Sequence, residues 1–233
     1  MSFTTLRNHI PNAITSMNLL CGCFAVVAAF SQGQALPAGL SGCQWAYVFI
    51  TLAAVADFLD GFVARLLHAV SGIGKELDSL CDLVSFGLAP AIVLYVLMTG
   101  YGEGLWALAA LLIPVFGAWR LARFNVDTRQ TTTFTGLPIP GNAIFWIGFT
   151  AYYASHPLPL WVVLACVAAL CVLMVCSLRM FSLKMHNLKS ISRNWAQYLL
   201  IVLAVALLAL MRLPGLAALI VCYVVLSIIK HEK

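Results

Sequence analysis

The sequence predicts an all-α, polytopic integral membrane protein with about eight transmembrane helices. Hydrophobic residues make up 63% of the 233 residues and charged residues 9%, with a mean hydropathy of +0.99. No soluble domain of this length needs so much apolar surface. Long apolar runs without polar alternation favour membrane-spanning helices over a β-barrel, since either must satisfy every backbone group internally.

The apolar runs divide into eight candidate spans. The first precedes no small-residue cleavage site and follows Pro11 and Asn12, so we expect a retained span and not a signal peptide. The fifth, seventh and eighth runs are short and would tilt differently or thin the bilayer. In chain order the spans are 13–31, 44–68, 76–99, 104–123, 140–155, 158–178, 196–211 and 214–229.

The basic residues orient these spans. With eight crossings, twelve of the thirteen Lys and Arg residues fall on one side, and Arg212 alone falls on the other. This positive-inside asymmetry predicts a protein of the cell membrane. Both termini and the segment between the second and third spans would lie on its cytoplasmic side. The formal net charge of +5 is therefore a topology signal and gives no reason to expect nucleic acid.

Cysteine spacing indicates neither a metal site nor a redox pair. The chain has eight cysteines, and no two have the C-x-x-C spacing. Seven fall within apolar runs, and Cys43 lies at the edge of one. They are expected to act as small apolar filler.

Four aspartates stand out in a chain with only eight acidic residues: Asp57, Asp60, Asp78 and Asp82. At 3.6 residues per turn, the first pair shares a helix face with Gly61 and Ala64. The second pair shares a face with Gly74. A short break near 69–72 separates the two segments, so two antiparallel helices should face each other with two carboxylates from each. Carboxylates at membrane depth are functional candidates by default.

Four ionised carboxylates in one cleft repel each other, and divalent cations would relieve that repulsion. Oxygen-only ligands favour Mg²⁺ or Mn²⁺, with Ca²⁺ as an alternative, over Zn²⁺. Such ions complete their shells with water and phosphate oxygens, and nearby Arg65 and Lys75 supply positive charge for phosphate. The remaining acidic residues are interpreted as surface charges: Glu76, Glu103, Asp127 and Glu232.

This stretch resembles the signature of the CDP-alcohol phosphatidyltransferase family. The family pattern D-x2-D-G-x2-A-R-x8-G-x3-D-x3-D is matched at all eight fixed positions over 26 residues, from Asp57 to Asp82. The segment from Pro11 to Asn18 resembles the first-helix element of the family. The resemblance covers about residues 8–190 of an expected single domain, 1–233, and leaves the last two spans, 196–229, outside it.

The resemblance implies a role for each matched residue. Asp57, Asp60 and Asp78 would hold two divalent cations, with Asp82 at the edge of the metal site and acting as the general base. The residues implied to contact the CDP-lipid are Asn12, Thr15, Asn18, Gly61, Ala64, Arg65, Ser71 and Gly74. A homodimer is also a family expectation.

A second resemblance narrows the acceptor. The segments 120–125 and 134–142 are similar to the branch of the family that uses L-serine, as is the length of eight spans. CDP-diacylglycerol and L-serine are then the expected partners, together with the lipid bilayer. Arg120 and Arg123 are candidates for the serine carboxylate, or else anchor the helix end. Asn125 is a candidate for the amino group, or else caps the helix.

The reaction implied is transfer of the phosphatidyl group from CDP-diacylglycerol to the serine hydroxyl, with release of CMP. The nearest alternative is the same chemistry with another acceptor, such as glycerol 3-phosphate, inositol phosphate or choline. A cation transporter with intramembrane carboxylates is the alternative from another class. It would place the carboxylates near the bilayer midplane, whereas these lie near the cytoplasmic ends of their spans. A purely structural membrane protein gives no reason for the spacing.

Overall fold

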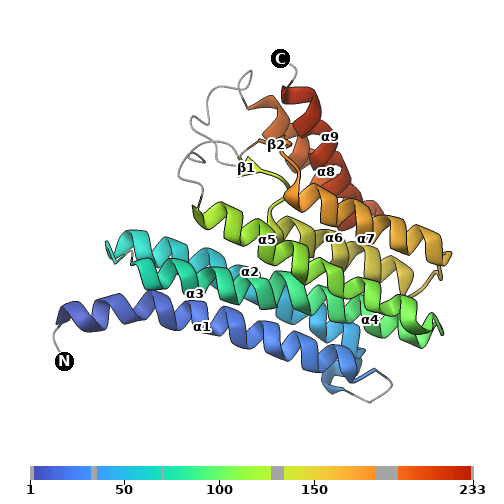
Figure 1. Cartoon of the computed structure of the whole chain (residues 1–233), viewed down its shortest axis with the longest axis horizontal. Helices are drawn as coiled ribbons and strands as arrows, with labels where there is room; N and C mark the ends of the chain where they lie inside the picture. The colour runs from blue at the N-terminus through green and yellow to red at the C-terminus, as the bar shows by residue number, and fades with distance from the viewer. Residues whose placement is uncertain (1–2, 33–35, 70, 127–133, 182–193, 232–233) are drawn as a thin grey trace. The chain divides into compact units, whose positions relative to one another are not determined.

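The computed structural model describes residues 3–32, 36–69, 71–126, 134–181 and 194–231. The chain divides into two compact units, residues 1–121 and 122–233. Figure 1 shows that helices dominate both units, and each unit is described by itself. That the whole chain forms one membrane-embedded domain stays a prediction.

The first unit is built from long helices. Its elements, up to the helix that continues into the second unit, are α1 (Phe3–Phe30), a 3₁₀ turn (Pro37–Gly39), α2 (Gly42–Leu66), α3 (Gly72–Asp82), a π-helical turn (Leu83–Leu88), α4 (Ala89–Gly100), a 3₁₀ stretch (Gly104–Leu111) and α5 (Leu112–Val126). The third helix begins four residues before the predicted 76, because the Ser71 side chain caps it.

Two serine caps set where the second and third helices begin. The Ser41 hydroxyl accepts from the Gln44 backbone N–H, and the Gln44 side chain accepts from the Ser41 N–H, so both form a capping box. The Ser71 hydroxyl accepts a 3.0 Å hydrogen bond from the Gly74 N–H. The break between α2 and α3 thus falls where the sequence predicts it.

Close approach of small residues holds the first unit together. The α1 helix packs most extensively against α2 and also contacts α3, the π-helical turn and α4. Ala25, Ala29, Ala46 and Ala53 are fully buried. Small side chains let helix backbones approach closely where lipid removes the hydrophobic drive for association.

Among the described residues, four helical segments are long and apolar enough to cross a membrane: 9–30, 42–66, 72–100 and 104–126. Three further apolar helices are shorter: 160–175, 195–211 and 215–230. Many large apolar side chains are exposed on these helices, as lipid-facing surfaces require. The predicted fold class, a polytopic helical membrane protein, is confirmed, and the count of eight spans stays a prediction.

In the residues that the structure describes, the second unit contains the remaining helices and a short strand pair. Its elements after α5 are β1 (Phe134–Thr135), α6 (Ile139–Tyr153), α7 (Leu160–Val175), β2 (Arg179–Met180), α8 (Trp195–Met211) and α9 (Gly215–His231). The α9 helix packs on both α6 and α8. The two strands pair antiparallel, with Phe134 opposite Met180, which the sequence pattern does not predict.

The chain bends at Gly136, in the segment between β1 and α6. Gly136 has a φ of +76°, and an added Cβ there would press on the Met174 carbonyl oxygen. The Gly136 and Leu137 N–H groups donate to the carbonyl oxygens of Leu178 and Leu173. This segment therefore joins β1 and α6 to the end of α7.

Candidate functional site

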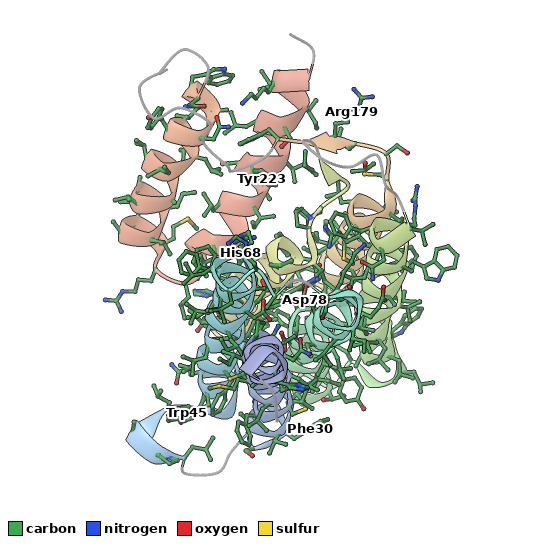
Figure 2. All side chains as sticks on the ribbon, turned by 90° about the vertical axis from the view of Figure 1, so that its left-hand side faces the viewer. Phe30, Trp45, His68, Asp78, Arg179 and Tyr223 are labelled. Atoms are coloured by element: carbon green, nitrogen blue, oxygen red, sulfur yellow. The ribbon has the colours of Figure 1, made fainter. Side chains whose placement is uncertain are left out.

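Three of the four aspartates converge from two helices. Asp57 and Asp60 come from α2 and Asp78 from α3, and one carboxylate oxygen of each lies within 4.8 Å of the others. Asp60 is buried and the other two are half-buried. Figure 2 looks nearly along these helices and shows Asp78 among the side chains of the bundle. The predicted facing of the two carboxylate stripes is thus observed at these three residues.

The oxygens of this cluster fit a metal ion. Asp60 Oδ2 and Asp78 Oδ1 are buried and accept no hydrogen bond from the described part of the chain. The Asp57 carboxylate interacts electrostatically with those of Asp78 and Asp60, and like charges this close repel each other. A divalent cation would hold the same oxygens with all three carboxylates ionised. An all-oxygen donor set suits Mg²⁺, Mn²⁺ or Ca²⁺.

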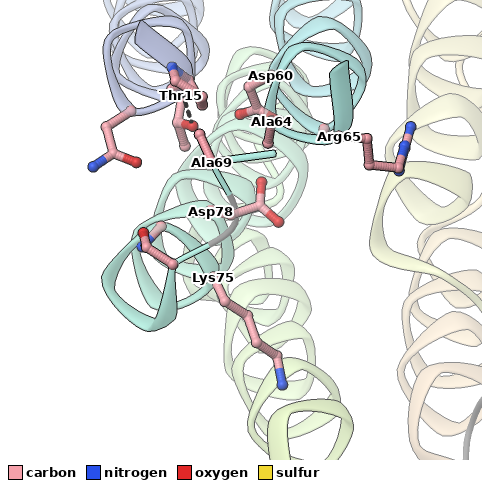
Figure 3. Close-up of a pocket in the computed structure, with 12 residues that line it drawn as sticks. Thr15, Asp60, Ala64, Arg65, Ala69, Lys75 and Asp78 are labelled. Carbon is pink, nitrogen blue, oxygen red and sulfur yellow. Dashed lines mark hydrogen bonds between the residues drawn. The ribbon is translucent and has the colours of Figure 1, made fainter. Parts of the chain in front are cut away.

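A cavity of about 230 Å³ opens beside the carboxylates. It lies among α1, α2, α3 and the segment that joins α2 to α3 (Figure 3). Seven of the eight residues predicted to contact a CDP-lipid line it. The lining residues are Pro11, Asn12, Thr15, Asp60, Gly61, Ala64, Arg65, Ala69, Ser71, Gly74, Lys75 and Asp78.

Small residues keep this cavity open. A Cβ at Gly61 would meet only the Arg65 guanidinium, 3.8 Å away. A Cβ at Gly74 would lie 3.0 Å from Ser71 Oγ and 3.1 Å from the Asn12 side-chain oxygen. Gly74 therefore lets the start of α3 come close to α1.

Polar and cationic groups surround the cavity. The Thr15 hydroxyl donates to the Pro11 carbonyl oxygen at 3.0 Å and is also within reach of the Asp60 carboxylate. Arg65 and Lys75 are exposed and extend outward in different directions (Figure 3). Carboxylates inside and two cations at the rim suit a ligand that carries phosphate groups.

Asp82 is not a member of the three-carboxylate cluster but interacts electrostatically with Asp57 and Asp78. It is 8% exposed and its Oδ1 accepts a 3.2 Å hydrogen bond from the Asn18 side-chain amide. Arg120 on α5, also 8% exposed, interacts electrostatically with Asp82. The role predicted for Asp82 at the edge of the metal site stays a prediction. Asn18 donates to Asp82 and is not among the residues that line the cavity, so its predicted contact with the CDP-lipid stays a prediction.

The other acceptor candidates belong to the second unit. The Arg123 side chain is exposed, and its Nη1 donates a 2.6 Å hydrogen bond to the Val175 carbonyl oxygen at the end of α7. Asn125 is half-buried. Both stay predictions as serine contacts.

Two residues that line the cavity were not among the predicted site residues. Pro11 lines the cavity next to Asn12, and Ala69 lines it from the break before α3. The position of Pro11 within the first-helix element could have indicated it. Ala69 contributes through its backbone position, which depends on how the chain turns after α2 and not on its residue type.

The part of the chain that carries this site is similar to known proteins. The sequence model described as CDP-alcohol phosphatidyltransferase matches residues 8–153, which include the cluster and the whole cavity lining. Three similar curated proteins all bear the name CDP-diacylglycerol–serine O-phosphatidyltransferase.

The relative from Bacillus subtilis is 36% identical over 145 residues, which are 61% of this chain and 77% of the relative. Those from Methanocaldococcus jannaschii and Saccharomyces cerevisiae are 34% and 36% identical over 63% of this chain, but the match spans only 63% and 55% of their own lengths. With the family model covering more than half of the sequence, this chain belongs to the CDP-alcohol phosphatidyltransferase family.

Proposed function

We propose that this protein is a phospholipid-synthesising transferase that moves the phosphatidyl group of CDP-diacylglycerol to the hydroxyl of L-serine. The products are phosphatidylserine and CMP. The observation that carries this proposal is the convergence of Asp57, Asp60 and Asp78 beside a cavity rimmed by Arg65 and Lys75. The names of the similar proteins support serine as the acceptor.

The cavity would bind the diphosphate of CDP-diacylglycerol. Arg65 and Lys75 would contact phosphate oxygens, and Gly61 and Gly74 leave room for a ligand near the backbone. Asp57, Asp60 and Asp78 would hold the divalent cations, two ions of Mg²⁺ or Mn²⁺. When bound, these ions would neutralise the charge of the diphosphate and of the leaving CMP.

Asp82 would act as the general base. It removes the proton from the serine hydroxyl as that oxygen attacks the phosphorus attached to diacylglycerol. The bond from this phosphorus to the CMP oxygen breaks, and CMP leaves with the bonding electron pair. Because the reaction is largely a matter of position and charge, orientation of the groups supplies much of the acceleration.

Arg120 is the stronger candidate for the serine carboxylate. It is buried and interacts with Asp82, so a carboxylate bound to it would bring the serine hydroxyl toward the base. Arg123 already donates to the Val175 carbonyl oxygen, a contact that anchors the end of α7. Asn125 stays a candidate for the amino group.

The orientation in the membrane is part of the same proposal. The Lys and Arg distribution puts both termini and the active site on the cytoplasmic side of the cell membrane, where L-serine is dissolved. Several of the basic residues that support this lie outside the described residues: Arg129, Lys184, Lys189, Arg193 and Lys233. We also propose that the whole chain forms a single domain and that it works as a homodimer, as the family resemblance implies.

The proposal is tested by measuring CMP release from CDP-diacylglycerol with purified protein and Mn²⁺ or Mg²⁺. L-serine, glycerol 3-phosphate, inositol phosphate, choline and ethanolamine are compared as acceptors. We expect the highest rate with L-serine. A much higher rate with another acceptor would contradict the serine assignment and leave the family chemistry in place. Cation flux through proteoliposomes without any CMP release would support the transporter alternative.

A further inference from the structure

Asn18 on α1 is fully buried and makes its side-chain contact with Asp82, 64 residues along the chain. The Asn18 amide nitrogen donates to Asp82 Oδ1 at 3.2 Å. A carboxylate can only accept, so the nitrogen end of the amide must face it. This hydrogen bond restricts rotation of the Asp82 carboxylate.

A second hydrogen bond holds Asn18 in turn. Ser85, also fully buried, donates from its hydroxyl to the Asn18 backbone carbonyl oxygen at 2.9 Å. Ser85 lies in the π-helical turn that begins directly after Asp82. A π-helical turn carries an extra residue, so it presents its side chains at angles that a regular α-helix would not give.

Direct backbone contact fixes the distance between these two elements. A Cβ at Gly22 would collide with Ser85 Oγ and would lie 2.9 Å from Ser85 Cα. Gly22 is one turn beyond Asn18 on the same helix. Because α1 touches the π-helical turn without an intervening side chain, Asn18 and Asp82 cannot drift apart by side-chain adjustment alone.

The free end of the Asn18 amide argues against a role in packing only. Its Oδ1 is buried and accepts no hydrogen bond from the residues that the structure describes. Such an atom costs about 1–3 kcal/mol, which an apolar side chain of the same volume would avoid. The amide is therefore explained by what its other end does to Asp82.

We propose that Asn18 is a positioning residue that aims the Asp82 carboxylate at the acceptor hydroxyl, and that Ser85 holds Asn18 in place for this task. The inference rests on the proposed function, because it assigns Asn18 to the base of that reaction. It differs from the lipid contact that the sequence resemblance implies for Asn18.

The test compares kcat and KM of Asn18→Leu with those of the unmodified enzyme, using CDP-diacylglycerol, L-serine and Mn²⁺. Asn18→Leu keeps the volume and removes the donor. We expect kcat to fall about 10–100-fold, the loss typical when the partner that orients a functional side chain is removed. The KM for CDP-diacylglycerol and the Mn²⁺ requirement should stay within about twofold, because no lipid or metal contact is lost.

Two serine variants provide a matched control. Ser85→Ala and Ser227→Ala each remove one buried hydroxyl that donates to a backbone carbonyl oxygen, at 2.9 and 2.8 Å respectively. Ser227 lies on α9 and donates within its own helix. We expect Ser85→Ala to lower kcat and Ser227→Ala to leave it unchanged. This pair also tests the proposal if Asn18→Leu fails to fold.

A double variant shows whether Asn18 acts through Asp82. Asp82→Asn should cut kcat by about 10²–10⁴-fold. The double variant Asn18→Leu/Asp82→Asn should have a kcat within about twofold of that of Asp82→Asn alone, since there is no base left to orient.

Three results would overturn the proposal. The first is an unchanged kcat in Asn18→Leu, and the second is an effect of Asn18→Leu only on the KM for CDP-diacylglycerol. The third is an equal fall in kcat when Asn18→Leu is made in the unmodified enzyme and in Asp82→Asn. Equal kcat in Ser85→Ala and Ser227→Ala would overturn the part assigned to Ser85. If Asp82→Asn has no measurable turnover, the double variant is uninformative. The proposal is then tested by whether Asn18→Leu changes kcat or the KM for CDP-diacylglycerol. An unmodified enzyme that releases no CMP with L-serine would instead contradict the proposed function.

Discussion

Asp60 and Asp78 each keep a buried carboxylate oxygen that accepts no hydrogen bond within the described ranges. Burial of a polar atom without a hydrogen-bond partner is unfavourable by about 1–3 kcal/mol, and by more for a charged group. Two such oxygens beside a third carboxylate would be strongly unfavourable in a chain that had no ligand for them. At the scale of single residues, the positions of these oxygens fit the proposed cation site.

Removal of one of these carboxylates should weaken metal binding. We expect Asp78→Asn to raise the Mn²⁺ concentration for half-maximal activity by about tenfold or more, because loss of even an outer partner of a metal ligand costs about 10–100-fold. Glu76→Gln is the control, since it removes one exposed acidic charge from the same helix, outside the cluster. Metal titrations of CMP release measure both. Equal shifts in the two variants would mean that only net charge matters.

Arg120 should determine the serine requirement. Arg120→Lys keeps the charge but loses the planar pair of donors that suits a carboxylate. The KM for L-serine should rise about tenfold, since a charge-assisted hydrogen bond contributes roughly 1.5–3 kcal/mol. The KM for CDP-diacylglycerol should change less. If the KM for L-serine rises in Arg123→Lys and not in Arg120→Lys, Arg123 and not Arg120 binds the serine carboxylate.

The residues of the site were largely predictable, and their contacts were not. Spacing alone identified the three converging aspartates, and the first-helix resemblance added Asn12 and Thr15. The partner of Asn18 was missed because it depends on a tertiary contact across 64 residues. Periodicity carries no information about such a contact.

At the scale of helices, the 3.6-residue period explains why the carboxylates of α2 and α3 meet. The turn between these helices was predictable because Ser71 and Gly72 are strong signals for a break and a cap. The π-helical turn at Leu83–Leu88 was not predictable, since its residues have ordinary helical patterning. The short β1–β2 pair was also missed, as two residues are too few for a strand pattern.

The close packing of α1 and α3 should be disturbed by a side chain at Gly74. Gly74→Ala places a methyl group 3.0 Å from Ser71 Oγ and 3.1 Å from the Asn12 side-chain oxygen, so α3 must shift. Overpacking of this kind costs about 1–3 kcal/mol, and we expect weaker CDP-diacylglycerol binding as a higher KM. Gly72→Ala is the matched control, because nothing lies within 4 Å of its Cβ. A higher KM in Gly72→Ala alone would contradict this account of α1–α3 packing.

At the scale of the whole molecule, composition predicted a helical membrane protein, and the Lys and Arg distribution predicts its orientation. The number of crossings is harder to predict. Several of the C-terminal helices are shorter than a typical span, and their tilt depends on packing and bilayer thickness.

Accessibility at the two ends of one helical segment tests the orientation. Gly72 and Gly100 are exposed, have open space at Cβ, and begin and end the segment 72–100. In a variant without native cysteines, an impermeant thiol reagent on intact cells should label Gly100→Cys, and should label Gly72→Cys only after permeabilisation. The opposite pattern would overturn the cytoplasmic active site. The native Cys43 is unsuitable as a probe because it is only 3% exposed.

Incorporation of isotope-labelled L-serine into extractable lipid tests the central claim most directly, that the carboxylate site transfers a phosphatidyl group to serine. Purified protein in liposomes should form labelled phosphatidylserine only when CDP-diacylglycerol and a divalent cation are both present. Excess chelator should stop the reaction and added Mn²⁺ should restore it, with one CMP released per labelled lipid. Labelled phosphatidylserine formed without CDP-diacylglycerol or in excess chelator, or no labelled lipid under any condition, would contradict the account.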